Sequence, residues 1–153
     1  MMGTKSLRQK AFDIITKHLL KQGRRSTGPG GVCMYRGSGG LQCAVGCLIP
    51  DIMYTERLEG ALLYGPLIEV LRDAGWGPLV VEQECYSLLA ASDSLNSARS
   101  VISKAGSDGT TLWALQGIHD GTPPEEWRRN LRAYAKVNGL KWPRCRPSEG
   151  YIK

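Results

Sequence analysis

Cysteine and histidine are the residues of this chain best suited to covalent or metal chemistry, and both are few. Cys43 could act as a nucleophile at the start of a helix, with His119 as its base and Asp120 beside it. Adjacent residues of a helix point in different directions, so we expect the side chains of His119 and Asp120 to diverge. The alternative is structural: Cys43 packs as a small apolar residue, and His119 with Asp120 closes a helix end.

The cysteine spacing does not favour a metal or disulfide framework. Zinc sites are typically built from close C-x2–4-C pairs, and only one such gap occurs among the cysteines. An odd number of cysteines also argues against a disulfide scaffold. We therefore predict no metal and no cofactor for this set: Cys33, Cys43, Cys47, Cys85 and Cys145.

Two short glycine-rich segments offer a different kind of chemistry. Residues 28–31 and 37–40 could hold a phosphate through backbone N–H groups, with Arg24, Arg25 or Arg36 adding positive charge. Neither segment matches a P-loop, and ordinary turns have the same composition. An anionic nucleotide ligand and a pair of simple turns are both compatible with these segments.

The net charge of +6 is distributed unevenly along the 153 residues. Residues 1–36 and 121–153 are both strongly basic, whereas residues 37–120 carry an excess of acidic groups. If the two ends converge in space, they form a basic pole that attracts a polyanionic or acidic partner. The residues we expect to contact that partner are Arg24, Arg25, Arg36, Arg128, Arg129, Arg132 and Trp142, the last of which we expect to be exposed.

The length and composition predict a single globular domain over residues 1–142, followed by a flexible tail over 143–153. Apolar residues make up 42% of the chain, which excludes a disordered or collagen-like protein. The sequence contains no apolar run of membrane-spanning length and no signal peptide, so we expect a cytoplasmic protein with no membrane partner.

Periodicity and capping residues predict a mostly helical fold. We expect a helix over residues 6–22, a short helix that begins at Pro66 and ends before Gly75, and a final helix that opens on a capping box from Thr122 to Glu125. Further helices are predicted from Pro78, from Asp93 and from Asp108 or Thr110, and a β-hairpin over residues 32–36 and 41–45. The predicted fold class is therefore a mostly α single-domain helical bundle with a small β-hairpin, and α+β is the second choice.

Three motifs in the chain resemble a known family. They are the segment from Cys33 to Gly37 (CMYRG), the segment from Leu41 to Asp51 (LQCAVGCLIPD), and the segment from Leu115 to Asp120 (LQGIHD) with a following W-x3-L helix. Together they resemble a family of small proteins encoded by bacteria, prophages and phages. The resemblance implies a phage-type accessory protein that binds a host protein, a protein–nucleic acid complex or nucleic acid directly, for example as an antagonist of host defence. The alternatives from the residues are a thiol-dependent enzyme using Cys43 and His119, and a binding protein for an anionic nucleotide.

Overall fold

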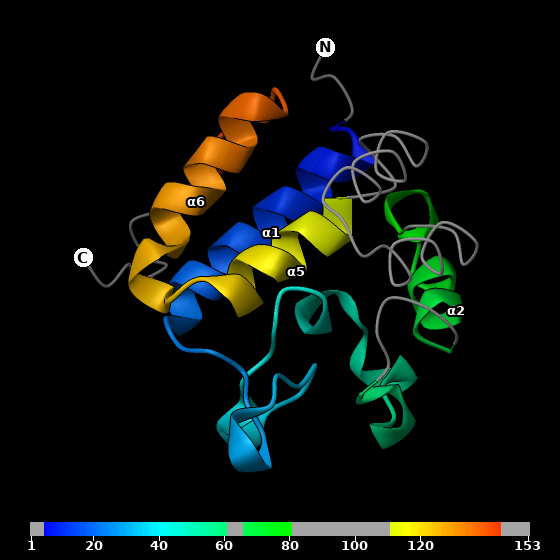
Figure 1. The fold of residues 1–153 in the computed structure, drawn as a ribbon. Coiled ribbons are helices and arrows are strands. Elements are labelled where there is room, and N and C mark those ends of the chain that lie inside the picture. Colours follow the sequence, from blue (N-terminus) through cyan, green and yellow to red (C-terminus); the bar gives the residue numbers. More distant parts are fainter. Residues whose placement is uncertain (1–4, 61–65, 81–110, 145–153) are drawn as a thin grey trace, which may run out of the picture. The chain divides into compact units, whose positions relative to one another are not determined.

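The computed structural model describes residues 5–60, 66–80 and 111–144. This part of the chain is mostly helical, as predicted, with four helices and several short 3-10 turns. The helices are α1 (Leu7–Gln22), α2 (Pro66–Asp73), α5 (Thr111–Gly121) and α6 (Pro124–Val137) (Figure 1). The helix predicted from Asp93 lies outside the described residues, and Pro78 lies in a 3-10 turn, Gly77–Leu79.

Helix α1 forms as the sequence predicts, because both of its ends carry a specific cap. The Ser6 hydroxyl accepts a hydrogen bond from the backbone N–H of Gln9 at 3.1 Å. Gly23 ends the helix with φ 63°, a left-handed conformation that favours glycine. The apolar face of the helix is fully buried at Phe12, Ile15 and Leu19.

The predicted β-hairpin is wrong, because the described residues contain no strand. The chain forms two loops of the same build instead, each closed by one isolated bridge: Thr27 with Cys33, and Arg36 with Gln42. Each loop turns over two consecutive glycines with positive φ, at residues 30–31 and 39–40. These paired glycines reverse the chain within a 3-10 turn, before a ladder of strand hydrogen bonds can extend. We call these segments the tandem glycine loops, residues 27–33 and 36–42.

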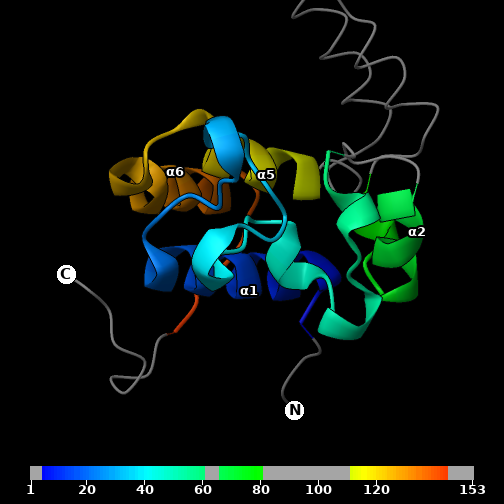
Figure 2. The same ribbon diagram turned by 90° about the horizontal axis from the view of Figure 1, so that it is seen from below.

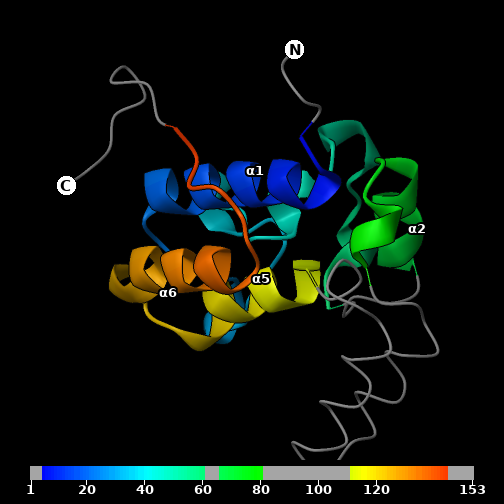
Figure 3. The same cartoon turned by 90° about the horizontal axis from the view of Figure 1, so that it is seen from above.

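Helices α1 and α6 pack against each other in antiparallel directions, although about 100 residues separate them in sequence (Figure 1). Near the start of α1, the Arg8 guanidinium donates to the Asn138 side chain at 3.0 Å. Beyond its other end, the Arg25 guanidinium donates to the Thr122 carbonyl at 2.7 Å. After α6 the chain turns back to α1 (Figure 3). There the Gln9 side chain pairs with both backbone groups of Lys141.

Helix α6 begins one residue later than the predicted capping box requires. Its N-cap is Pro123, which makes no side-chain cap hydrogen bond. The Thr122 hydroxyl donates backwards to the Ile118 carbonyl at 2.7 Å, so it closes the end of α5 instead. The carbonyl of Thr122 accepts from the Trp127 indole at 3.1 Å, which fixes the corner between the two helices.

The chain forms two compact units. The first comprises Met1–Leu48 with Leu115–Lys153, and the second comprises Ile49–Ala114. In the second unit, α2 packs on the turn Gly77–Leu79 through buried Leu67, Leu71 and Leu79. None of the helices in the described ranges is long and apolar enough to cross a membrane.

Candidate functional site

A thiol, an imidazole and a carboxylate meet in the first unit. Cys33 lies at the end of the first glycine loop, and His119 and Asp120 lie in the last turn of α5. The Cys33 Sγ atom is 3.8 Å from His119 Nδ1, and the ligand atoms of all three residues lie within 4.8 Å of one another. The cysteine that the structure brings to His119 is therefore Cys33, whereas the sequence led us to expect Cys43.

The expected divergence of His119 and Asp120 is wrong. Asp120 Oδ1 lies 2.7 Å from His119 Nδ1, a hydrogen bond between adjacent residues. Nδ1 is the ring nitrogen nearer the backbone, so the short side chain of the next residue can reach it without leaving the helix. The Asp120 carboxylate remains 44% exposed, whereas the imidazole is fully buried.

Gln116 connects Cys33 and Asp120 to the backbone at Val45, just after the second glycine loop. The sequence analysis did not identify Gln116 as a site residue. Its Nε2 donates to Asp120 at 3.0 Å and to Cys33 Sγ at 3.5 Å. Its Oε1 accepts from the backbone N–H of Val45 at 2.9 Å. Gln116 stands four residues before Asp120, a spacing that brings side chains together on one helix face. That spacing was a usable signal, but the contact with Val45 was not visible in the sequence. Figure 2 shows the segment with the tandem glycine loops lying against α5.

The imidazole of His119 has a defined protonation pattern. The backbone N–H of Ser26 donates to Nε2 at 3.3 Å, so Nε2 carries the lone pair and Nδ1 carries the proton that it donates to Asp120. Burial lowers the pKa of His119, but Asp120 and Cys33 outweigh burial and raise it. Protonation of Nε2 would place a second donor opposite the Ser26 N–H and would cost this hydrogen bond. The indole of Trp127 stacks on the ring with centroids 5.2 Å apart.

The carboxylate of Asp120 is held in its charged form. Partial burial works to raise the pKa of Asp120, but the hydrogen bonds from His119, Cys33 and Gln116 outweigh it and lower the pKa. The Asp120 carboxylate therefore supplies a negative charge at the exposed edge of the cluster.

Cys33 and Cys47 are protonated thiols, because their surroundings raise their pKa values. The neighbouring Cys43 thiol and burial raise the pKa of Cys33 well above its ordinary range. Burial raises the pKa of Cys47 to about 12. Cys43 is fully buried, and its sulfur accepts from the backbone N–H of Gly46 at 3.3 Å. These environments fit packing roles better than a nucleophile, which needs a thiolate.

The arrangement also lacks the geometry of a thiol-activating base. Such a base uses one ring nitrogen for the thiol and is oriented through the other. Here Cys33 and Asp120 approach the same nitrogen of His119, and Ser26 occupies the second. The cluster can, however, offer one sulfur, one nitrogen and one oxygen ligand to a metal ion.

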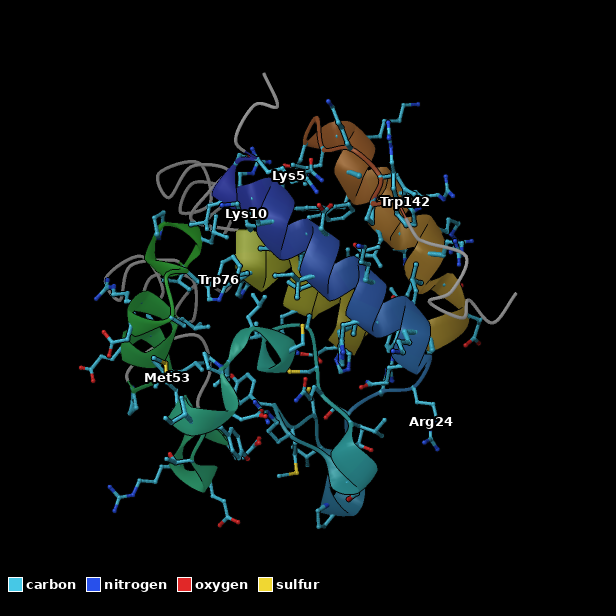
Figure 4. The ribbon with its side chains drawn as sticks, turned by 180° about the vertical axis from the view of Figure 1, so that it is seen from behind. Lys5, Lys10, Arg24, Met53, Trp76 and Trp142 are labelled. Carbon is cyan, nitrogen blue, oxygen red and sulfur yellow. The ribbon has the colours of Figure 1, made fainter. Side chains whose placement is uncertain are left out.

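Several arginines expected to bind a partner lie on the surface of the first unit. Arg24, which Figure 4 labels beyond the end of α1, is exposed, and the exposed Arg25 contacts the corner before α6. Arg128 and Arg129 are exposed on α6, and Arg129 pairs with Glu126 at 3.1 Å.

Three other residues in this expected set have different surroundings. Arg132 lies over the ring of Trp142 at 4.4 Å, so it is exposed but stacked. Trp142 itself packs edge-on against Phe12 of α1 and is half-buried, so the expectation of an exposed tryptophan is wrong (Figure 4). Arg36 is half-buried at the base of the second glycine loop.

The folding of α1 against α6 concentrates positive charge in the first unit. This unit holds sixteen of the 20 Lys and Arg residues but only five of the 14 Asp and Glu residues, a net charge of +11. The second unit holds the other four basic and nine acidic residues, a net charge of −5. The two basic ends of the sequence therefore belong to one compact body.

Comparison with known proteins returned no match to a family model, a curated protein or a solved structure. The likeness to small phage and prophage proteins thus rests on the three sequence motifs.

Proposed function

We propose that this chain is a binding protein whose first unit docks on an anionic surface of a host macromolecule. The observation that supports the proposal is the net charge of +11 carried by that unit. A charge of this size on a small body attracts polyanions over distances comparable to the Debye length, about 8–10 Å at ordinary ionic strength. Association would then be fast at low salt and sensitive to added salt.

The antiparallel pair of α1 and α6 provides the surface for this contact. At about 1.5 Å per residue, each helix is over 20 Å long. Basic side chains are exposed along both helices, from Lys10 and Lys21 on α1 to Arg128 and Lys136 on α6. The hydrogen bonds at both ends of the pair fix its geometry, so these charges are presented by a rigid scaffold.

The sequence resemblance suggests the biological setting. The resemblance implies a phage-type accessory protein that acts on a host factor, and a host-defence complex that presents an anionic surface would be such a partner. The thiol enzyme is the weaker candidate, because the two ring nitrogens of His119 are both occupied and the pKa of Cys33 is raised.

A pair of matched double variants tests the proposal. Arg24→Gln with Arg129→Gln removes two exposed charges from the first unit, and Arg57→Gln with Arg72→Gln removes two exposed charges from the second. Each protein is expressed in a bacterial host and purified, and the co-purified partner is identified. Its affinity is then measured by fluorescence anisotropy at salt concentrations from about 50 to 300 mM.

We expect the first double variant to bind more weakly than the wild type, with a shallower dependence of affinity on salt. For a nucleic acid partner the slope should fall by about one for each lost phosphate contact. The control variant should bind as tightly as the wild type or more tightly. Binding that is insensitive both to salt and to the first variant would refute the proposal and place the interface on apolar surface.

A further inference from the structure

We propose that Cys33, His119 and Asp120 form a binding site for a divalent transition metal of the zinc class, in contrast to the prediction of no metal drawn from the cysteine spacing. Only two segments of the chain build this site. Two ligands come from the end of α5 and one comes from the first glycine loop. The three ligand atoms lie within 4.8 Å of one another, with one of each type: a sulfur, an imidazole nitrogen and a carboxylate oxygen. This proposal is independent of the docking function proposed above.

The ligand types select the class of metal. Thiolate and imidazole ligands favour zinc and its transition-metal neighbours, whereas calcium and magnesium prefer an all-oxygen shell. Zinc–sulfur bonds of about 2.3 Å and zinc–nitrogen bonds of about 2.0 Å place neighbouring ligand atoms of a tetrahedron about 3.5 Å apart. The sulfur–nitrogen separation of 3.8 Å and the nitrogen–oxygen separation of 2.7 Å lie on either side of that value. Small side-chain shifts would bring the three atoms to the geometry of a metal site.

Gln116 supports the two ligands that are anionic when the metal is bound, the Cys33 thiolate and the Asp120 carboxylate. Its amide nitrogen donates to Cys33 Sγ and to Asp120 Oδ1, and both remain hydrogen-bond acceptors when they bind a metal. The backbone N–H of Val45 fixes the orientation of the amide. Hydrogen bonds of this kind orient metal ligands, and their removal typically weakens metal affinity 10- to 100-fold.

Metal binding changes the protons of the cluster in a defined way. The Cys33 thiol loses its proton to solvent when the metal–sulfur bond forms, so one proton is released for each ion bound. The ring proton of His119 moves from Nδ1 to Nε2, because Nδ1 becomes a ligand. This movement costs the hydrogen bond from Ser26, which is long at 3.3 Å. Affinity should therefore fall as the pH is lowered.

The site has an open side. The side chain of Asp120 is 44% exposed and Cys33 is half-buried, so solvent reaches the cluster from this direction. Cys43 does not belong to the three-residue ligand set, and its sulfur accepts the Gly46 N–H. Three protein ligands with one position left for water are typical of zinc sites that bind or activate a further molecule, whereas closed four-ligand sites are structural.

Cobalt is the probe for the test, because a thiolate bound to Co²⁺ gives a charge-transfer band in the near ultraviolet. The full chain, kept reduced with a phosphine, is titrated with Co²⁺ at neutral pH. We expect the band to saturate at one ion per chain and to disappear in Cys33→Ser. The control is Cys47→Ser, because Cys47 is also half-buried but lies outside the cluster.

Two further variants keep the test decisive if Cys33→Ser is poorly folded. Asp120→Asn preserves the shape of a partly exposed side chain, and Gln116→Ala removes the supporting amide. We expect each to weaken Co²⁺ affinity by at least tenfold while circular dichroism stays unchanged. His18→Gln, which alters the other histidine, should leave affinity unchanged. Absence of the band in the wild type, or a band that survives Cys33→Ser, would overturn the proposal.

Discussion

Gly46→Ala should destabilise the first unit strongly, because the chain passes too close to this residue for any side chain. A Cβ at Gly46 would lie 2.8 Å from the carbonyl carbon of Tyr35 and closer still to its oxygen. Ordinary van der Waals contacts begin at about 3.4 Å, so the backbone would have to move by more than an ångström. Neither neighbour is a flexible side chain that could swing away. We expect a loss of about 3 kcal/mol, from strain and from loosened packing.

Gly117→Ala is the matched control for this change. Gly117 lies inside α5, is exposed, and has nothing within 4 Å of a Cβ. Alanine is a better helix former than glycine, so this variant should be more stable by about 0.5–1 kcal/mol. Both are measured by urea unfolding, together with hydrogen exchange at Val45, whose N–H should exchange faster in Gly46→Ala. A loss below about 1 kcal/mol for Gly46→Ala would refute the close approach of the two segments.

Three other outcomes follow from the same unit. Burial lowers the pKa of His18, so near pH 6 the native state binds fewer protons than the unfolded chain. The native state therefore loses stability as the pH falls. In urea unfolding at pH 7 and pH 5, His18→Gln should show a smaller loss of stability between the two pH values than the wild type. Trp127→Phe removes the indole hydrogen bond to Thr122, and calorimetry should show a loss of about 1–3 kcal/mol. The raised pKa of Cys33 should make its alkylation by iodoacetamide at pH 8 slower than that of a free cysteine, and unfolding in urea should remove the difference.

The helices could be predicted because their signals are local. Ser6 and Gly23 bound α1 by side-chain and backbone preferences that act within one turn. Pro66 opens α2 as expected for the first position of a helix. The capping box at Thr122 was a wrong prediction, because the hydroxyl had two possible partners. The hydroxyl donates to the carbonyl of Ile118, one turn earlier, and does not cap a backbone N–H of α6.

The loop region and the cluster could be predicted only in part. Apolar composition around residues 32–36 suggested a strand, but the paired glycines on either side limit each loop to one bridge. His119 and Asp120 were identified as chemically competent from their types alone. The choice of Cys33 over Cys43 depends on contacts across 86 residues, which no local pattern encodes. The expected basic pole depended only on the two basic ends of the chain meeting in space. The packing of α1 against α6 brings the helices near the two ends together.

The wide sequence separation of α1 and α6 has a consequence during synthesis. The face of α1 that carries Phe12 and Leu19 leaves the ribosome before its helical partner exists, since about 100 residues must be added before α6 begins. At about 5–20 residues per second, that interval lasts roughly 5–20 s, far longer than the microseconds a helix needs to form. The part of this face that α6 covers therefore stays without its helical partner for many seconds, flanked by lysines and arginines. We therefore expect newly made protein to bind chaperones, and we expect this binding to end once α6 has emerged from the ribosome.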